Sequence, residues 1–238
     1  MLPSLVALGL AGVVAAASPS QLPRKSLAVH VIHRCLPTAN CPPMRIVTRM
    51  KDETERIWLS LDVQIAWIDS IDAGTEAHPA GLTVMLEEFD PPWPAERGFL
   101  LAELHQPASA CDWGLARVWV RQIRRHVASV RREGHPFTTL PTALADTLLG
   151  RALGRALAHE IGHYLIGTAE HAAHGLMRAR FAPQELLADA IQPLYCLSSH
   201  ERAALMSCRT DRHADRMVVD ETSSSPPADR KSRAADRE

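Results

Sequence analysis

The feature that most constrains the fold of this 238-residue chain is one long helical pattern in its second half. Apolar residues recur at helical spacing from Thr142 to Ile166, which predicts a helix with one apolar face. Thr142, after Pro141, is placed to cap this helix, and Gly167 is placed to end it. The apolar positions are Leu144, Leu148, Leu149, Ala152, Leu153, Ala156 and Leu157. The chain is long enough for one sizeable core and hardly for two independent domains.

The last turns of this predicted helix read His159-Glu160-Ile161-Gly162-His163. Residues four apart project from the same face of a helix, so His159 and His163 present two imidazoles to one point, as a tetrahedral Zn²⁺ site requires. Glu160 lies beside that point, where a carboxylate can accept a proton from zinc-bound water and return it to a leaving amine. Gly162 leaves the helix surface open. The alternative is that both histidines are ordinary polar residues of a surface helix.

Residues 167–177 follow with Gly-Thr-Ala-Glu-His-Ala-Ala-His-Gly-Leu-Met. A glycine ends the helix, a histidine comes within reach of the metal, and a Gly-Leu-Met turn follows. The segment resembles the metzincin superfamily of zinc endopeptidases, whose motif is HExxHxxGxxH followed by a Met-turn, and it looks most like the matrixin-like members. The resemblance is densest from Arg155 to Arg178. More loosely, it covers the order of strands and helices from Leu27 onward.

The resemblance implies a role for each matching residue. Glu160 would be the general base, Gly167 the turn glycine and Met177 the residue of the Met-turn. The implied activity is hydrolysis of peptide bonds by a metal-activated water, with Zn²⁺ as cofactor and a peptide or protein as substrate. The implied zinc ligands are His159, His163 and His171.

The segment departs from the family motif at three points. The glycine stands one residue later and the third histidine two residues later, so the turn is expanded. His174 is therefore an alternative third ligand. The family's tyrosine after the Met-turn is absent, because Arg178 and Ala179 stand there.

A second zinc-peptidase pattern uses the same two histidines. Gln184 to Asp189 looks like the NExxSD segment of thermolysin-like gluzincins, and Glu185 follows His163 by 22 residues. In that pattern Glu185 would bind zinc and Asp189 would orient His159. The alternative, which we favour because a histidine lies nearer, is that both acidic residues are exposed charges on an amphipathic helix.

The remaining pattern predicts an α+β fold. Alternating or β-branched segments predict strands at 27–32, 63–68, 82–86, 99–104 and 115–120. Helical spacing predicts an amphipathic helix over 45–60, and Pro183 can begin a last helix from Gln184 to about Leu197. The expected architecture is zincin-like: a small mixed β-sheet with an active-site helix and a short C-terminal helical subdomain.

The two ends of the chain differ from this catalytic domain, which we expect over 27–208. Met1 to Ala17 is apolar and ends in three alanines, which is typical of a signal peptide, although no Lys or Arg precedes the apolar stretch. The protein is therefore expected to be secreted or periplasmic, with no stable membrane insertion after cleavage. Residues 209–238 are rich in charge and low in complexity, which predicts a disordered tail.

Five cysteines and a run of arginines complete the sequence features. Export permits disulfides, and Cys35/Cys41 and Cys196/Cys208 are the locally plausible pairs, with Cys111 left over. The formal net charge of −1 gives no argument for a nucleic-acid partner. The arginines could attract an acidic substrate, but a solvated surface is the simpler interpretation. They are Arg117, Arg121, Arg124, Arg125, Arg131 and Arg132.

These observations lead to one expected function and its alternatives. We expect an exported zinc-dependent metallopeptidase with Glu160 as general base. The competing class is a non-catalytic zinc-binding or metal-free exported protein that uses the same fold to bind a partner. Hydrolysis of a non-peptide amide is a third option.

Overall fold

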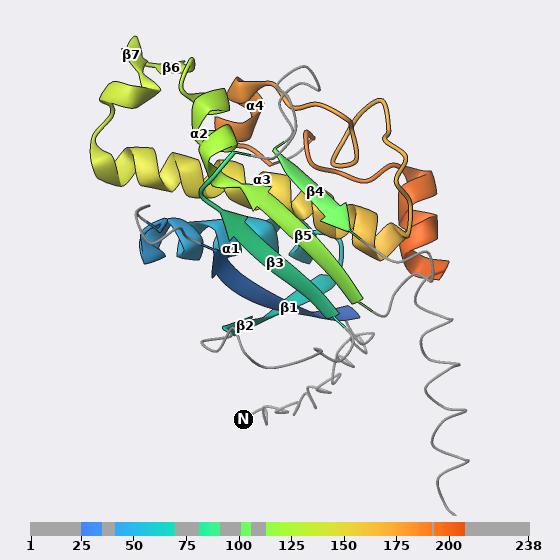
Figure 1. Ribbon diagram of the computed structural model, residues 1–238. Coiled ribbons are helices and arrows are strands. Elements are labelled where there is room, and N and C mark those ends of the chain that lie inside the picture. Colours follow the sequence, from blue (N-terminus) through green and yellow to red (C-terminus); the bar gives the residue numbers. More distant parts are fainter. Residues whose placement is uncertain are drawn as a thin grey trace, which may run out of the picture.

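The computed structural model describes residues 25–34, 41–69, 81–90, 101–105, 113–191 and 193–207. Five strands of these residues form one sheet in the order β2-β1-β3-β5-β4, seen in Figure 1. Neighbouring strands are parallel except at one edge, where β4 is antiparallel to β5. The strands are β1 (Lys25–Arg34), β2 (Val63–Asp69), β3 (Gly81–Glu87), β4 (Ala102–His105) and β5 (Trp113–Trp119).

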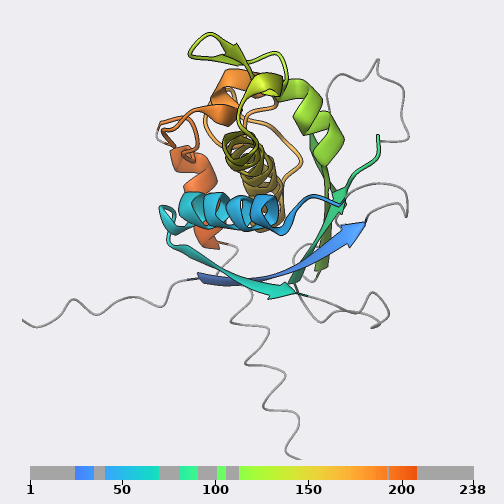
Figure 2. The ribbon, with the colours of Figure 1, turned by 90° about the vertical axis from the view of Figure 1, so that its left-hand side faces the viewer.

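Two long helices, α1 (Met44–Leu59) and α3 (Thr142–Ile166), cover one face of this sheet (Figure 2). The alternation of β3 directs Leu82, Val84 and Leu86 into the core between the sheet and the helices. On β5, Gly114 lies so close to α3 that a Cβ there would be 2.8 Å from Cδ2 of Tyr164. The sheet therefore supports α3 along the turns that carry His159 and His163.

Glycines also allow α1 and α3 to pack with close backbones. A Cβ on Gly150 would lie 2.7 Å from the carbonyl oxygen of Ile46, and one on Gly154 would lie 2.6 Å from that of Met50. The close backbones also bring Thr54 of α1 to α3, where its hydroxyl donates to the carbonyl of Gly154 at 3.1 Å. The two helices thus fix each other's position directly before the histidine-bearing turns.

The remaining elements are short. They are α2 (Val120–Val127), β6 (Arg131–Arg132), β7 (His135–Pro136), the 3-10 helix η2 (Phe137–Thr139) and α4 (Pro183–Leu187). Two of them, α2 and α4, pack against α3. Residues 199–207 are also helical. Ser198 and Glu201 cap that segment reciprocally, because the backbone N–H of each donates to the side chain of the other.

The predicted α+β fold, with a small mixed sheet packed against a long helix over residues 142–166, is confirmed. All five strands exist near their predicted positions, although the fourth is short and residues 99–100 of its predicted range lie outside the described residues. The long helix has the predicted range, but Thr142 is its first residue and Pro141 holds the cap position without a side-chain hydrogen bond. The helix α2 was not predicted, and it begins at Val120, which was assigned to the strand before it.

The predicted last helix from Gln184 to about Leu197 is wrong. The observed α4 ends at Leu187. Arg151 donates to the carbonyls of Leu187 and Ala188, and Arg155 donates to that of Ala190. These carbonyls bond to side chains of α3, and Pro193 lacks the N–H that a continuing helix needs.

Some predicted features lie outside the described residues. These are the predicted signal peptide and the tail 209–238. Among the helices that the structure describes, none combines the length and apolar character needed to span a membrane.

Candidate metal centre

The helix α3 brings two imidazoles together near its C-terminal end. His159 and His163 are each 7% exposed. Their ring centroids are 4.5 Å apart with the ring planes nearly perpendicular, and the two Nε2 atoms are 3.0 Å apart. The predicted convergence of the two rings on one point is therefore observed.

Backbone carbonyls set the tautomer of both rings. Nδ1–H of His159 donates to the carbonyl of Leu176 at 2.7 Å, and Nδ1–H of His163 donates to that of Thr168 at 2.6 Å. A carbonyl can only accept, so each neutral ring carries its proton on Nδ1 and a bare lone pair on Nε2. Two bare Nε2 atoms at 3.0 Å repel each other unless a cation lies beside both.

This arrangement fits a zinc ion. Two nitrogens at the Zn–N bond length and the tetrahedral angle are separated by roughly 3.3 Å, close to the observed Nε2 separation. The hydrogen bond from each Nδ1–H to a carbonyl is the usual outer partner of a metal-binding histidine.

His171 adds a third ring from the loop after α3. The possible ligand atoms of His159, His163 and His171 all lie within 4.8 Å of one another. The ring of His171 stacks on that of His159 at 5.2 Å and meets that of His163 edge-on at 4.9 Å. Unlike the first two, His171 is exposed. Among the described residues, this is the group of three or more potential ligands that could hold a metal ion.

The expanded turn returns His171 to the helix by two backbone features. Gly167 ends α3 in the left-handed region at φ 73°, and its N–H donates to the carbonyl of His163. Farther along, the N–H of Ala172 donates to the carbonyl of Met177 at 2.8 Å, which closes the loop that contains His174. His174 is exposed and does not belong to the cluster of three histidines.

Burial keeps the histidines neutral. The pKa of His159 is lowered from 6.5 to about 4, mainly by burial, with smaller contributions from His163 and His171. The pKa of His163 is lowered as well, again mainly by burial. At neutral pH both rings are therefore unprotonated at Nε2 and competent to bind a metal.

Glu160 is 6% exposed, and its environment favours the protonated form. Burial raises its pKa from 4.5 to about 8, and the nearby charge of Glu103 on β4 contributes in the same direction. In the metal-free protein this carboxyl therefore holds its proton at neutral pH.

Met177 packs against α3 at Gly162, the residue before His163. A Cβ on Gly162 would be 2.2 Å from Sδ of Met177, so only glycine allows this contact. Met177 is 1% exposed, which leaves its side chain little room to move away. Met177, which the resemblance identified as the Met-turn residue, therefore packs against the histidine-bearing turn of α3.

The structure does not place Glu185 and Asp189 at the site. Glu185 pairs with Arg178 and accepts from the backbone N–H of Ala182 at 2.7 Å, so it caps α4. Asp189 pairs with Arg151 and Arg132, and the hydrogen bond from Arg151 is the main cause of its lowered pKa. The carbonyl of Leu176, rather than Asp189, orients His159. The gluzincin alternative is therefore wrong.

Three contributors to the site were missed at the sequence level. The carbonyls of Leu176 and Thr168 belong to backbone and carry no residue signal. Phe181 meets the ring of His159 edge-on at 5.7 Å, and no pattern pointed to it. The sequence held one signal that polar contacts support this part of α3. It is Arg155, a charged residue within the apolar helix one turn before His159.

The cysteines differ in part from expectation. Cys41 is disulfide-bonded, and the other predicted member of its pair, Cys35, lies outside the described residues. Cys196 is a free thiol whose Sγ–H donates to the carbonyl of Pro193 at 3.0 Å. The predicted Cys196/Cys208 disulfide is therefore wrong.

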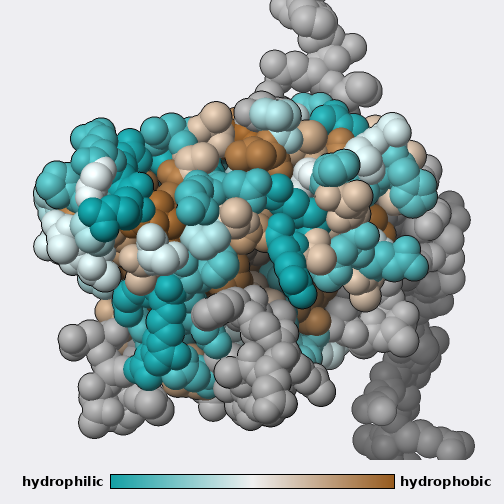
Figure 3. Space-filling view, turned by 90° about the horizontal axis from the view of Figure 1, so that it is seen from above, coloured by the Kyte–Doolittle hydropathy of each residue, from teal (hydrophilic) through white to brown (hydrophobic). Residues whose placement is uncertain are grey.

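The arginine run is paired with acidic groups and carbonyls. Arg121 and Arg125 contact Asp90, Arg124 contacts Glu88, and Arg131 donates to the carbonyl of Gly134. In Figure 3, hydrophilic side chains cover most of the upper face, with apolar surface between them. The run is thus a solvated, charge-paired surface, as the simpler interpretation had it.

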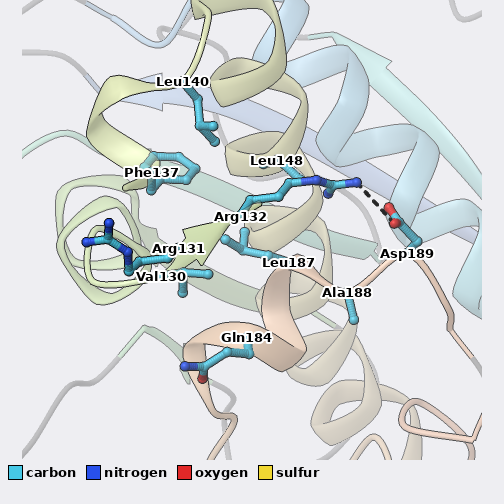
Figure 4. Close-up of a pocket in the computed structure, with 10 residues that line it drawn as sticks. All are labelled: Val130, Arg131, Arg132, Phe137, Leu140, Leu148, Gln184, Leu187, Ala188 and Asp189. Carbon is cyan, nitrogen blue, oxygen red and sulfur yellow. Dashed lines mark hydrogen bonds and ion pairs between the residues drawn. The ribbon is translucent and has the colours of Figure 1, made fainter. Parts of the chain in front are cut away.

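A separate cavity of about 200 Å³ lies beside the N-terminal half of α3 (Figure 4). Phe137, Leu148 and Leu187 belong to its apolar wall. Arg132 reaches across it to Asp189, with an N–O distance of 3.2 Å. None of the three clustered histidines lines this cavity, so it is distinct from the metal centre.

Comparisons with known proteins add little to these observations. No protein-family model and no curated protein matches the sequence. Among solved structures, the chain is similar to the crystal structure of archaemetzincin from Methanopyrus kandleri. The similarity covers 81% of this chain and 98% of the other, with a TM-score of 0.44 and 13% sequence identity. The functional argument therefore rests on the geometry of the site.

Proposed function

We propose that this chain is an exported zinc-dependent metallopeptidase, in which His159, His163 and His171 hold the metal and Glu160 is the general base. The observation that supports the proposal most is the pair of bare Nε2 atoms 3.0 Å apart, with a third imidazole beside them. Burying two neutral rings with their lone pairs facing each other is unfavourable without a cation.

The roles follow from the chemistry of the donor set. His159, His163 and His171 would hold Zn²⁺, which when bound would supply a Lewis acid for a water molecule and a peptide carbonyl. Glu160 accepts a proton from the attacking water and passes it to the leaving amine. Its carboxylate form is favoured beside a divalent cation, whereas the metal-free site raises the pKa of Glu160 to about 8. The carboxylate of Glu160 would then be available to act as a base.

Export is proposed on two observations. The apolar stretch from Met1 to Ala17 has the composition of a signal peptide, and Cys41 is disulfide-bonded, as is common in oxidising compartments. Fusing residues 1–25 to a reporter enzyme tests this proposal. The reporter should appear outside the cytoplasm with the fusion cleaved near Ala17, and its retention in the cytoplasm would refute export.

The peptidase proposal is tested with the purified full chain. Zinc content is measured by elemental analysis, and peptide-bond cleavage is measured on casein and on a peptide library. Glu160→Gln should retain the zinc of the wild-type protein while cleavage falls at least about 10³-fold, because the amide cannot accept the proton. Cleavage by Glu160→Gln at the wild-type rate would refute its assignment as the base.

A matched pair of variants tests the third ligand. His171→Ala should lower zinc content and abolish cleavage, whereas His174→Ala, three residues away and outside the cluster, should change neither. Full zinc content with no cleavage in the wild-type protein would favour the non-catalytic zinc-binding alternative.

A further inference from the structure

Arg178 and Glu185 form an ion pair in the segment that follows His171. Nη1 of Arg178 donates to Oε1 of Glu185 at 2.9 Å, and Nη2 lies 2.9 Å from Oε2. The side chains are 17% and 29% exposed, so water screens this pair less than a fully exposed one. Arg178 directly follows Met177 and stands two residues after Leu176, whose carbonyl accepts from His159.

Glu185 is tied in turn to the helix that carries His159. Its backbone carbonyl accepts from Nη1 of Arg155 at 2.6 Å and from the hydroxyl of Tyr195 at 3.0 Å. Arg155 is fully buried on α3, one turn before His159, and it pairs with Glu53 of α1 at 2.7 Å. The position of Glu185 is thus fixed relative to α3.

The guanidinium of Arg178 also contacts Phe181, a second neighbour of His159. It lies over the ring of Phe181 at 4.4 Å, and the ring of Phe181 meets that of His159 edge-on. Phe181 also stacks on Tyr195, with ring centroids 5.5 Å apart. Both the carbonyl of Leu176 and the ring of Phe181, which contact His159 from outside α3, are therefore linked to Arg178.

We infer that the Arg178–Glu185 ion pair is a positioning device for His159: it clamps residues 176–178 against α3, so that the carbonyl of Leu176 holds Nδ1–H and directs Nε2 to the metal. The inference rests on the proposed function only in taking His159 as a metal ligand. Arg178 and Glu185 touch neither metal nor substrate in this role. Glu185 thus contributes to the site as a support, not as a ligand.

The test uses the full chain with Glu160→Gln as background, so that cleavage activity does not enter. Arg178→Gln and Glu185→Gln each remove one charge, and the amide oxygen introduced by Glu185→Gln can still accept from the N–H of Ala182, which preserves the cap of α4. Arg125→Gln, which breaks the exposed ion pair between α2 and Asp90, is the control. Zinc affinity is measured by competition with a chelator, and the Nδ1–H signal of His159 is followed by NMR in the metal-free protein.

Each clamp variant should weaken zinc binding about 10–100-fold, as removal of an outer partner of a ligand does, and should broaden or remove the Nδ1–H signal of His159. The double variant should bind zinc no more weakly than the weaker-binding single variant, because both substitutions break the same ion pair. Arg178→Lys keeps the charge but not the planar guanidinium that lies over Phe181, so it should restore only part of the affinity. Arg125→Gln should match the parent.

Two results would overturn the clamp. One is zinc affinity within about threefold of the parent in both Gln variants, well short of the change expected on losing an outer partner. The other is an unchanged Nδ1–H signal of His159 in variants that unfold at a lower temperature, because the pair would then support only the stability of the fold. A parent protein that binds no zinc would refute the proposed function, while the NMR comparison would still decide the clamp.

Discussion

Gly162 and Met177 form a contact that leaves no room for an added methyl group. A Cβ at position 162 would lie 2.2 Å from Sδ of Met177, which is buried beneath the helix. Gly162→Ala should therefore lower the free energy of unfolding by about 1–3 kcal/mol, even though alanine favours a helix. Denaturant unfolding of the metal-free protein measures this change.

A second substitution tests whether the contact with Met177 causes this loss of stability. In a Met177→Ala background the sulfur is gone, so Gly162→Ala should cost clearly less than it does with Met177 present. Equal costs in the two backgrounds would show that the contact with Met177 is not responsible.

The raised pKa of Glu160 makes the stability of the metal-free protein depend on pH, and it fixes the sign of that dependence. Its pKa is 4.5 in the unfolded chain and about 8 in the folded protein, so between these values the folded state binds more protons. The stabilising effect of the protonated carboxyl is complete below pH 4.5 and is lost as the pH rises through 8. The buried histidines act in the opposite direction, because their pKa values are lowered.

Comparing Glu160→Gln with the wild type cancels the contribution of the histidines. The stability of the variant relative to wild type should rise between about pH 4.5 and pH 8, by on the order of 5 kcal/mol. Urea unfolding with a chelator present measures the difference at each pH. A difference that does not change with pH would contradict the raised pKa of Glu160.

The sequence predicted the two helix-borne ligands well because their placement is local. A helix fixes the relation of His159 to His163 by its own period, whatever the remainder of the chain does. The carbonyls of Leu176 and Thr168 could not be predicted, because they reach the rings only through the path of the loop after Gly167. The ion pair of Glu185 with Arg178 could not be predicted for the same reason: spacing alone gives no position relative to α3.

Two glycines in the loop after α3 have positive φ for different reasons, which gives a matched test of the turn. Gly167 ends α3 at φ 73° with nothing within 4 Å of an added Cβ. Gly175 has φ 80°, and an added Cβ would be 2.3 Å from the carbonyl oxygen of Cys196, which accepts from the N–H of Leu176.

Gly167→Ala should therefore cost about 1 kcal/mol of stability, the usual cost of a left-handed residue with a side chain. Gly175→Ala should cost more, because the backbone of residue 196 must also move, and it should weaken zinc binding through Leu176 and His159. Thermal unfolding and chelator competition measure the two effects. Equal losses of stability in the two variants would contradict the close contact at Gly175.

A helix could be predicted where one of its faces is apolar and a proline or glycine stands at each end. The helix α3 is such a case, with Pro141 before it and Gly167 after it. The helix α2 was missed because Arg121, Arg124 and Arg125 obscure an apolar face of only three buried residues. The last helix was overextended because Arg151 and Arg155 bond to carbonyls of residues 187–190, a tertiary effect that no local pattern contains.

At the scale of the whole molecule, the metal centre joins α3 to the loop that follows it. A ligand that binds only the folded state stabilises it by an amount set by its concentration and affinity, about 2.7 kcal/mol at one hundred times the dissociation constant. Adding that excess of zinc to chelator-treated protein should therefore raise the unfolding temperature by several degrees, since each kcal/mol is worth roughly 2–4 °C in a chain of this size.

The histidine variants are the controls for this shift. His174→Ala should retain the full shift with zinc, and His171→Ala should lose most of it. An unfolding temperature that zinc leaves unchanged in the wild-type protein would contradict a metal centre built from these residues.

The unequal anchoring of the three imidazoles has a consequence for how the protein gains and releases its ion. His159 and His163 are buried and held by carbonyls, whereas His171 stands exposed on a loop. Two donors are thus ready before any cation arrives, and the third completes the shell from the solvent side. In the zinc-bound protein, solvent would therefore reach the ion on the side of His171 rather than past the two buried rings.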